Sequence, residues 1–182
     1  MGSAGRSRCV RQLLLIAGLC VSALASGVPA ARADEEFVHH GISIAVPSGW
    51  WAPDARMSSV IQPVFRLTLS DRVLRRTARD SGPCYAGLAR QIQADGVVAI
   101  LSEALGADFK PERFHHRSKR ISLPPRKPGQ DNSCLGDHAT LVIFRQSGRG
   151  FYLWIAAGRQ APPAKIKTLL RALNGMTVAA RA

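Results

Sequence analysis

The pattern from residue 139 to residue 178 constrains the fold more than any other part of the 182-residue sequence. Two apolar runs, 139–144 and 151–156, flank a short polar segment that contains two glycines. Apolar runs of this length around a glycine-containing turn predict a β-hairpin. Because glycine adopts positive φ without steric cost, a type II′ turn with Gly148 and Arg149 as its two-residue loop is the expected connection.

That loop would pair Arg145 with Tyr152 and Ile143 with Trp154, and neighbours along each strand would point to opposite faces. One face is apolar and consists of Val142, Phe144, Phe151, Leu153 and Ile155. The other face is amphipathic and consists of Ile143, Arg145, Tyr152 and Trp154. A slip of the pairing would mix these two sets, so the pattern favours this register.

Apolar residues after the hairpin recur at the spacing of one helical face: Ile166, Leu169, Leu170 and Leu173. Proline at positions 162 and 163 suits the first turn of a helix, and Gly175 suits its end. The sequence therefore predicts a helix of roughly three turns that covers one face of the hairpin.

The other expected elements are strands at 35–46, 60–72, 97–101 and 121–123 and a short helix at 84–93. Pro63 indicates an edge position or a bulge for its strand, and the continuous apolar run 97–101 suits a central strand. The predicted fold class is α+β: a mostly antiparallel sheet of about five strands with the C-terminal helix packed on one face.

The first 33 residues have the features of a secretory signal peptide. Three arginines lie in the first eleven residues, and an apolar segment follows at 13–25. Ala31 and Ala33 supply the small residues at positions −3 and −1 of a cleavage site. The apolar segment is shorter than the roughly 18–20 residues of a membrane-spanning helix. We expect cleavage after Ala33, which leaves one exported domain (34–182) that is secreted or periplasmic. Cleavage after Ala25 and retention as an uncleaved anchor are the alternatives.

The charge balance favours anionic partners. The chain has 25 Lys and Arg against 12 Asp and Glu, and four arginines but no acid leave with the signal segment, so the exported domain carries a formal net charge of +9. The densest basic stretch holds Arg113, Arg117, Lys119, Arg120, Arg126 and Lys127. Such a run predicts docking on an anionic lipid or a cell-envelope polymer, with a merely solvated loop as the alternative. Nucleic acid does not fit an exported protein that lacks a stacking motif.

The amphipathic face of the hairpin is a second candidate surface. Arg145, Tyr152 and Trp154 are residue types that are enriched at interfaces with other proteins. The alternative is that a second layer covers them, such as the helix expected at 84–93. A pocket for a small apolar ligand between helix and sheet is the alternative function.

Cys84 and Cys134 are the only cysteines after the signal segment, and an even pair in an exported protein predicts a disulfide. In the chain-entropy model, closing a loop of this length stabilises the fold by about 4 kcal/mol. Two free thiols and a metal pair are the alternatives.

No metal, cofactor or catalytic residue is expected. The histidine pairs 39–40 and 115–116 are adjacent, and neighbours in a strand point apart, so exposed loop histidines are favoured over a site in which 115–116 meets His138. Asp131, Asn132 and Asp137 lie around Cys134 and could offer oxygen ligands to calcium, but they lack the spacing of an EF-hand loop. An ordinary polar loop is therefore favoured. Nucleophile-elbow, P-loop and metalloprotease motifs are absent, which disfavours an enzyme.

Several short motifs resemble a group of small exported actinobacterial proteins of unknown function, over roughly residues 84–178. They are Cys84, the segment 91–97 leading to Glu103, Phe144-Arg-x-x-Gly-Arg-x-Phe151, Gly158 and Leu170-x-x-Leu173. The resemblance implies an exported α+β domain and no particular activity or cofactor. The Pro-x-Gly-Trp motif at 47–50, together with the terminal helix, is distantly similar to the Mog1p/PsbP-like architecture.

Overall fold

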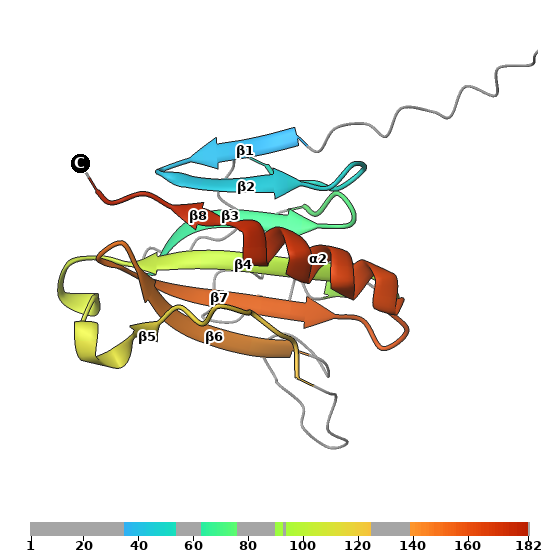
Figure 1. The fold of residues 1–182 in the computed structure, drawn as a ribbon. Coiled ribbons are helices and arrows are strands. Elements are labelled where there is room, and N and C mark those ends of the chain that lie inside the picture. Colours follow the sequence, from blue (N-terminus) through green and yellow to red (C-terminus); the bar gives the residue numbers. More distant parts are fainter. Residues whose placement is uncertain (1–34, 54–62, 76–89, 93, 125–138, 182) are drawn as a thin grey trace, which may run out of the picture. The chain divides into compact units, whose positions relative to one another are not determined.

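The computed structural model describes residues 35–53, 63–75, 90–92, 94–124 and 139–181, and all of them belong to the unit that spans 32–182. They form a three-stranded sheet, a five-stranded sheet and one α-helix near the C-terminus. Most strand pairs are antiparallel (Figure 1). The predicted α+β fold class is therefore confirmed.

The three-stranded sheet has the order β1-β2-β8. Its strands are β1 (Glu35–His39), β2 (Ile42–Val46) and β8 (Thr177–Val178). The strand predicted within 35–46 from the alternation at 42–46 is confirmed as β2. β1 was not predicted as a separate strand, because the chain turns at His40 and Gly41. Both residues have positive φ, 48° and 70°, which is the geometry of a type I′ hairpin turn.

The five-stranded sheet has the order β3-β4-β7-β6-β5. Its strands are β3 (Val64–Ser70), β4 (Val97–Ala104), β7 (Arg149–Ala157), β6 (Ala139–Gln146) and β5 (His115–His116). The expected central strand is confirmed as β4, whose eight residues are all buried. β3 lies at the edge of this sheet and has a register shift between Phe65 and Leu67. Pro63 predicted an edge position or a bulge for this strand, and β3 has both.

The hairpin of β6 and β7 forms, but its turn lies one residue earlier than predicted. Gln146 pairs with Arg149, and the loop residues Ser147 and Gly148 have φ of 52° and 74°, a type I′ turn. The Ser147 hydroxyl donates to the carbonyl of Val178 at 2.7 Å, which stabilises this conformation. Arg149 is not in the loop because its side chain is buried inside the sheet.

The predicted faces of the hairpin are nevertheless confirmed, because the pairing is displaced by two residues and side chains alternate with period two. The apolar face contributes four fully buried side chains: Phe144, Phe151, Leu153 and Ile155. Val142 packs against the same cluster.

Helix α2 (Pro163–Gly175) covers the core, as predicted. It contacts β2 and β4 and crosses in front of the strands (Figure 1). Leu169 and Leu173 are fully buried, and Ile166 and Leu170 are partly buried. Residues of both sheets and of α2 belong to one core cluster, and a smaller second cluster includes Val98 and Ile100 of β4. No helix among the described residues is long and apolar enough to cross a membrane.

The segment between β4 and β6 departs from the prediction. Two short 3₁₀ helices, η2 (Gly106–Asp108) and η3 (Pro111–Arg113), precede β5. The strand expected at 121–123 does not form. Its backbone is satisfied by a side chain, since the amide of Asn174 accepts from Ile121 N at 2.6 Å and donates to Ile121 O at 3.1 Å.

Candidate anion-binding site

A shallow pocket with a volume of about 400 Å³ lies where β6 ends, beside the C-terminus of α2. We call it the cationic pocket; its lining residues are His116, Arg117, Ser118, Lys119, Arg145, Gln146, Ser147 and Asn174. The described lining residues include no Asp or Glu. The pocket joins two candidate sites that the sequence treated separately, the basic stretch and the amphipathic hairpin face.

The parallel pairing of β5 with β6 brings these two segments together. It places His116 opposite Arg145, and Arg145 Nη2 lies 2.9 Å from His116 Nε2. Arg145 is the donor in this contact, since a guanidinium has no acceptor. Arg145 Nε is buried and makes no hydrogen bond to any described residue, and the charge of this guanidinium is paired with no described carboxylate.

Arg117 belongs to the pocket wall, but its guanidinium is used in hydrogen bonds within the fold. Its guanidinium donates to Leu173 O and Met176 O, both at 2.6 Å, and to Gln146 Oε1 at 2.7 Å. These carbonyls lie at the end of α2, where the helix leaves acceptors unsatisfied and its dipole is negative. Burial lowers the pKa of Arg117. Arg117 therefore caps the helix and cancels the negative potential that would otherwise face the pocket.

Lys119 and Arg120 follow on a segment that is fastened to α2 through Asn174, and both side chains are exposed. Lys119 lines the pocket and Arg120 is its neighbour in sequence. Arg113 is exposed on η3 and is not among the lining residues. Four of the predicted residues lie outside the described ones: Arg126, Lys127, Cys84 and Cys134.

The aromatic members of the predicted interaction face are partly covered. The Tyr152 ring stands edge-on to Phe114 at 5.3 Å. Trp154 packs against a second core cluster that includes Ile92, a residue of the segment expected to be a covering helix. Only Arg145 of this face lines the cationic pocket.

A second arginine cluster, around Glu103, escaped the sequence analysis. Glu103 is fully buried in β4, and Arg149 holds it by two hydrogen bonds, Nε to Oε1 at 2.8 Å and Nη2 to Oε2 at 2.9 Å. Arg66 Nε reaches Oε2 at 2.6 Å and Arg181 Nη2 reaches Oε1 at 2.7 Å. The available signal was one acid within an otherwise apolar strand sequence.

Electrostatics identifies this Glu103 cluster as structural. Burial alone would raise the pKa of Glu103, but the hydrogen bonds from Arg149 and Arg66 lower it to about 2. Arg149 Nη1 also donates to His40 O at 3.0 Å and to Ala179 O at 3.2 Å. The cluster thus ties the β1–β2 turn and the C-terminal tail to the five-stranded sheet.

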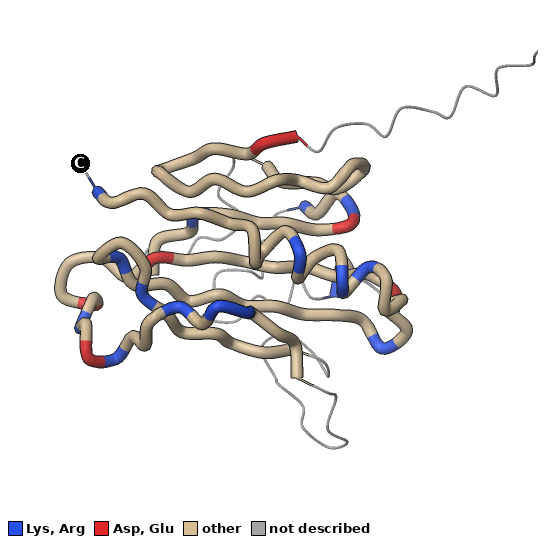
Figure 2. Tube along the Cα trace, viewed as in Figure 1, with Lys and Arg blue, Asp and Glu red and all other residues tan. Residues whose placement is uncertain are grey.

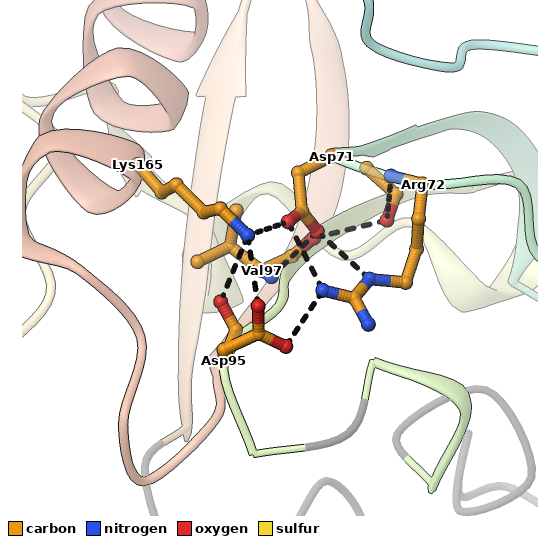
Figure 3. A network of polar contacts seen from close by, with 6 residues as sticks. Asp71, Arg72, Asp95, Val97 and Lys165 are labelled. Atoms are coloured by element: carbon orange, nitrogen blue, oxygen red, sulfur yellow. Dashed lines mark hydrogen bonds and ion pairs between the residues drawn. The ribbon is translucent and has the colours of Figure 1, made fainter.

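A third cluster joins the start of α2 to the sheet (Figure 3). Asp71 accepts from Lys165 Nζ at 2.6 Å and from Val97 N at 2.9 Å, and Arg72 Nη2 reaches Asp95 at 2.9 Å. Burial alone would raise the pKa of Asp71, yet the bonds from Lys165 and Val97 lower it. Lys165 is therefore committed to carboxylates.

Within the described parts of the chain, no group of three or more His, Cys, Asp or Glu residues could hold a metal ion. Comparisons with protein-family models, curated proteins and solved structures give no match for this chain. The resemblance to exported actinobacterial proteins accordingly stays a prediction.

Proposed function

We propose that this protein is an exported, non-enzymatic binding module that takes an anionic group of the cell envelope into the cationic pocket. The observation that carries the proposal is the lining itself: Lys119, Arg145 and His116 converge there without a described carboxylate. The formal net charge is +13 on the full chain and +9 without the four arginines of the signal segment, which adds a general attraction for anionic partners.

The lining residues take different roles in this proposal. Arg145 offers a planar guanidinium suited to two oxygens of one anion, and Lys119 offers a point charge on a flexible stem. Arg117 positions the wall and screens the end of α2. His116 contacts Arg145 Nη2 through Nε2 at 2.9 Å and so helps to hold that guanidinium in place.

The alternative, a pocket for a small apolar ligand between helix and sheet, has less support. Leu169 and Leu173 of α2 are fully buried in the same cluster as Ile44 and Leu101. The helix thus packs directly on the sheet in the region where such a ligand would have to lie.

The test is calorimetric titration of the exported protein with tripolyphosphate over a salt series. We expect binding that weakens as salt rises and is lost in Lys119→Ser and in Arg145→Gln. Lys110→Ser, an exposed lysine outside the pocket, is the control and should bind like the unaltered protein. Equal affinity in all three variants would contradict the proposal.

A further inference from the structure

Helix α2 carries a row of cations that leads to the cationic pocket. Lys167, Arg171 and Asn174 are spaced by four and three residues, which places them on one face of the helix. Lys167 and Arg171 are exposed, whereas Asn174 lines the pocket. Figure 2 shows basic positions along α2 and along the segment beside it.

This row has a defined start. Lys165, two residues before Lys167 and therefore on another face of the helix, is paired with Asp71 and Asp95, so its charge is already compensated. No Asp or Glu occurs in α2, in 114–124 or in 139–148. The positive charge from Lys167 onward is therefore not compensated within the segments that form this surface.

The row is also continuous with the pocket. A helix rises about 1.5 Å per residue, so Lys167 and Arg171 are about 6 Å apart along the axis and Asn174 is about 4.5 Å farther on. The carbonyls at the end of α2 would interrupt the positive potential, but Arg117 covers them at 2.6 Å. Asn174 in turn holds the Lys119 segment against the helix through Ile121.

We propose that the ligand is a linear polyanion, with one anionic group in the cationic pocket and the following groups along Lys167 and Arg171. This inference rests on the proposed function and specifies its partner. Lys167 and Arg171 extend the positive charge of the pocket along α2, and a chain that carries an anionic group on each repeating unit can contact both the pocket and these two cations. Several such contacts in one molecule add their effects, as multivalent binding does.

The distribution of apolar side chains favours a polymer over a lipid bilayer. The exposed large hydrophobic residues among those described are Val38, Val73 and Ile143. None of them belongs to α2 or to the 117–124 segment, and Ile143 on β6 is the one that lies in a segment of this surface. A single such side chain gives little to insert between lipids. A concave pocket also suits a polymer segment better than a flat array of headgroups.

The experiment compares ligand lengths and three double variants of the exported protein. The ligands are tripolyphosphate, linear polyphosphate of about fifty units, and vesicles of anionic lipid. The row variant is Lys167→Ser with Arg171→Ser, and the pocket variant is Lys119→Ser with Arg145→Gln. The control variant, Lys110→Ser with Arg113→Ser, removes the same charge from exposed positions that do not line the pocket.

We expect the row variant to bind the long polymer about tenfold more weakly or worse while it keeps the affinity for tripolyphosphate. The dependence of log affinity on log salt should become shallower by about 1.5 units, because each of the two lost cations releases about 0.7–0.9 counterions. The control variant should change the affinity for the polymer by less than about threefold, as expected for distant, screened charges.

The outcomes separate the two proposals. Equal weakening of polymer binding in the row and control variants, or tighter binding to vesicles than to polymer, would overturn the inference and leave the pocket intact. Undiminished binding of tripolyphosphate by the pocket variant would instead overturn the proposed function. Thermal unfolding of each variant confirms that the fold is retained, since all but one of the altered side chains are exposed.

Discussion

Arg145 and Arg149 lie on either side of the same β-turn, and their surroundings differ in one respect. Arg149 is 5% exposed and meets a buried carboxylate with two hydrogen bonds. Arg145 is partly exposed, meets no described carboxylate, and keeps its Nε without a partner. Burial with a carboxylate makes an arginine part of the fold, whereas the same side chain without one is available to an external anion.

This comparison extends to the two clusters. In the Glu103 cluster three arginines converge on one carboxylate from β3, β7 and the C-terminal tail. In the cationic pocket several cations converge without a described carboxylate. Changes in the first cluster should therefore alter stability, and changes in the second should alter binding.

The largest effect is expected for Glu103→Gln, which removes the charge shared by Arg66, Arg149 and Arg181. Breaking a buried ion pair on one side typically costs about 3–5 kcal/mol, because the remaining charge stays buried without compensation. Urea unfolding measures the loss. Glu112→Gln, an exposed acid on η3, is the control. A loss below about 1 kcal/mol would contradict the assignment of the Glu103 cluster to stability and of the cationic pocket to binding.

Acid should weaken the fold through the same carboxylate. The folded-state pKa of Glu103 is about 2, below the ordinary 4.5, so its contribution is fully present above about pH 4.5 and is lost as the pH falls toward 2. A shift of this size corresponds to about 3 kcal/mol. Unfolding free energies from pH 6 to pH 2 measure it, and Glu103→Gln should flatten the curve. An equally steep curve in that variant would assign the acid sensitivity to other groups.

A smaller loss is expected for Arg117→Ser, the pocket residue that behaves like the Glu103 cluster. The variant leaves the carbonyls of Leu173 and Met176 without their donor, which costs about 1–3 kcal/mol. Thermal unfolding monitors it, with Arg120→Ser as the exposed neighbouring control. If both variants unfold at the same temperature, the hydrogen bonds to the helix end contribute little to stability. Arg117 would then belong with Lys119 and Arg145 as a residue available for binding.

The periodic features of this fold were predictable and the long-range ones were not. Alternation in 139–156 predicted which side chains are buried, even though the turn was misplaced. The turn was misplaced because Arg149 is held by Glu103, 46 residues away, and no local pattern records that partner. The turn at His40 was missed because His-Gly is not one of the Asn-Gly or Asp-Gly pairs that usually indicate a type I′ turn.

The candidate site shows the same division. Arg117, Lys119 and Arg145 were each singled out from charge and position. Their meeting depends on β5, a two-residue strand paired in parallel with β6, which is too short to have a periodic signal. Asn174 acts through side-chain bonds to Ile121, and an asparagine near a helix end gives no sign of such a role.

The smallest effect is expected when arginine is replaced by lysine at position 145 or at position 149. This pair of variants tests the difference between Arg145 and Arg149 directly. Lysine keeps the charge but cannot make two parallel bonds to a carboxylate. Arg149→Lys should therefore cost about 1.5–3 kcal/mol, because charge-assisted bonds to Glu103 are lost. Arg145→Lys should change the unfolding free energy by less than about 0.5 kcal/mol, since it loses one exposed contact with His116 and no bond to a described carboxylate.

Chemical denaturation of the two variants side by side measures this difference, and the unaltered protein is the common reference. Arg145→Lys should also retain most of the affinity for tripolyphosphate, since the positive charge stays in the pocket. If Arg145→Lys destabilises the protein as much as Arg149→Lys does, then Arg145 is a structural residue like its neighbour across the turn. The cationic pocket would in that case lose the residue that most distinguishes it from the Glu103 cluster.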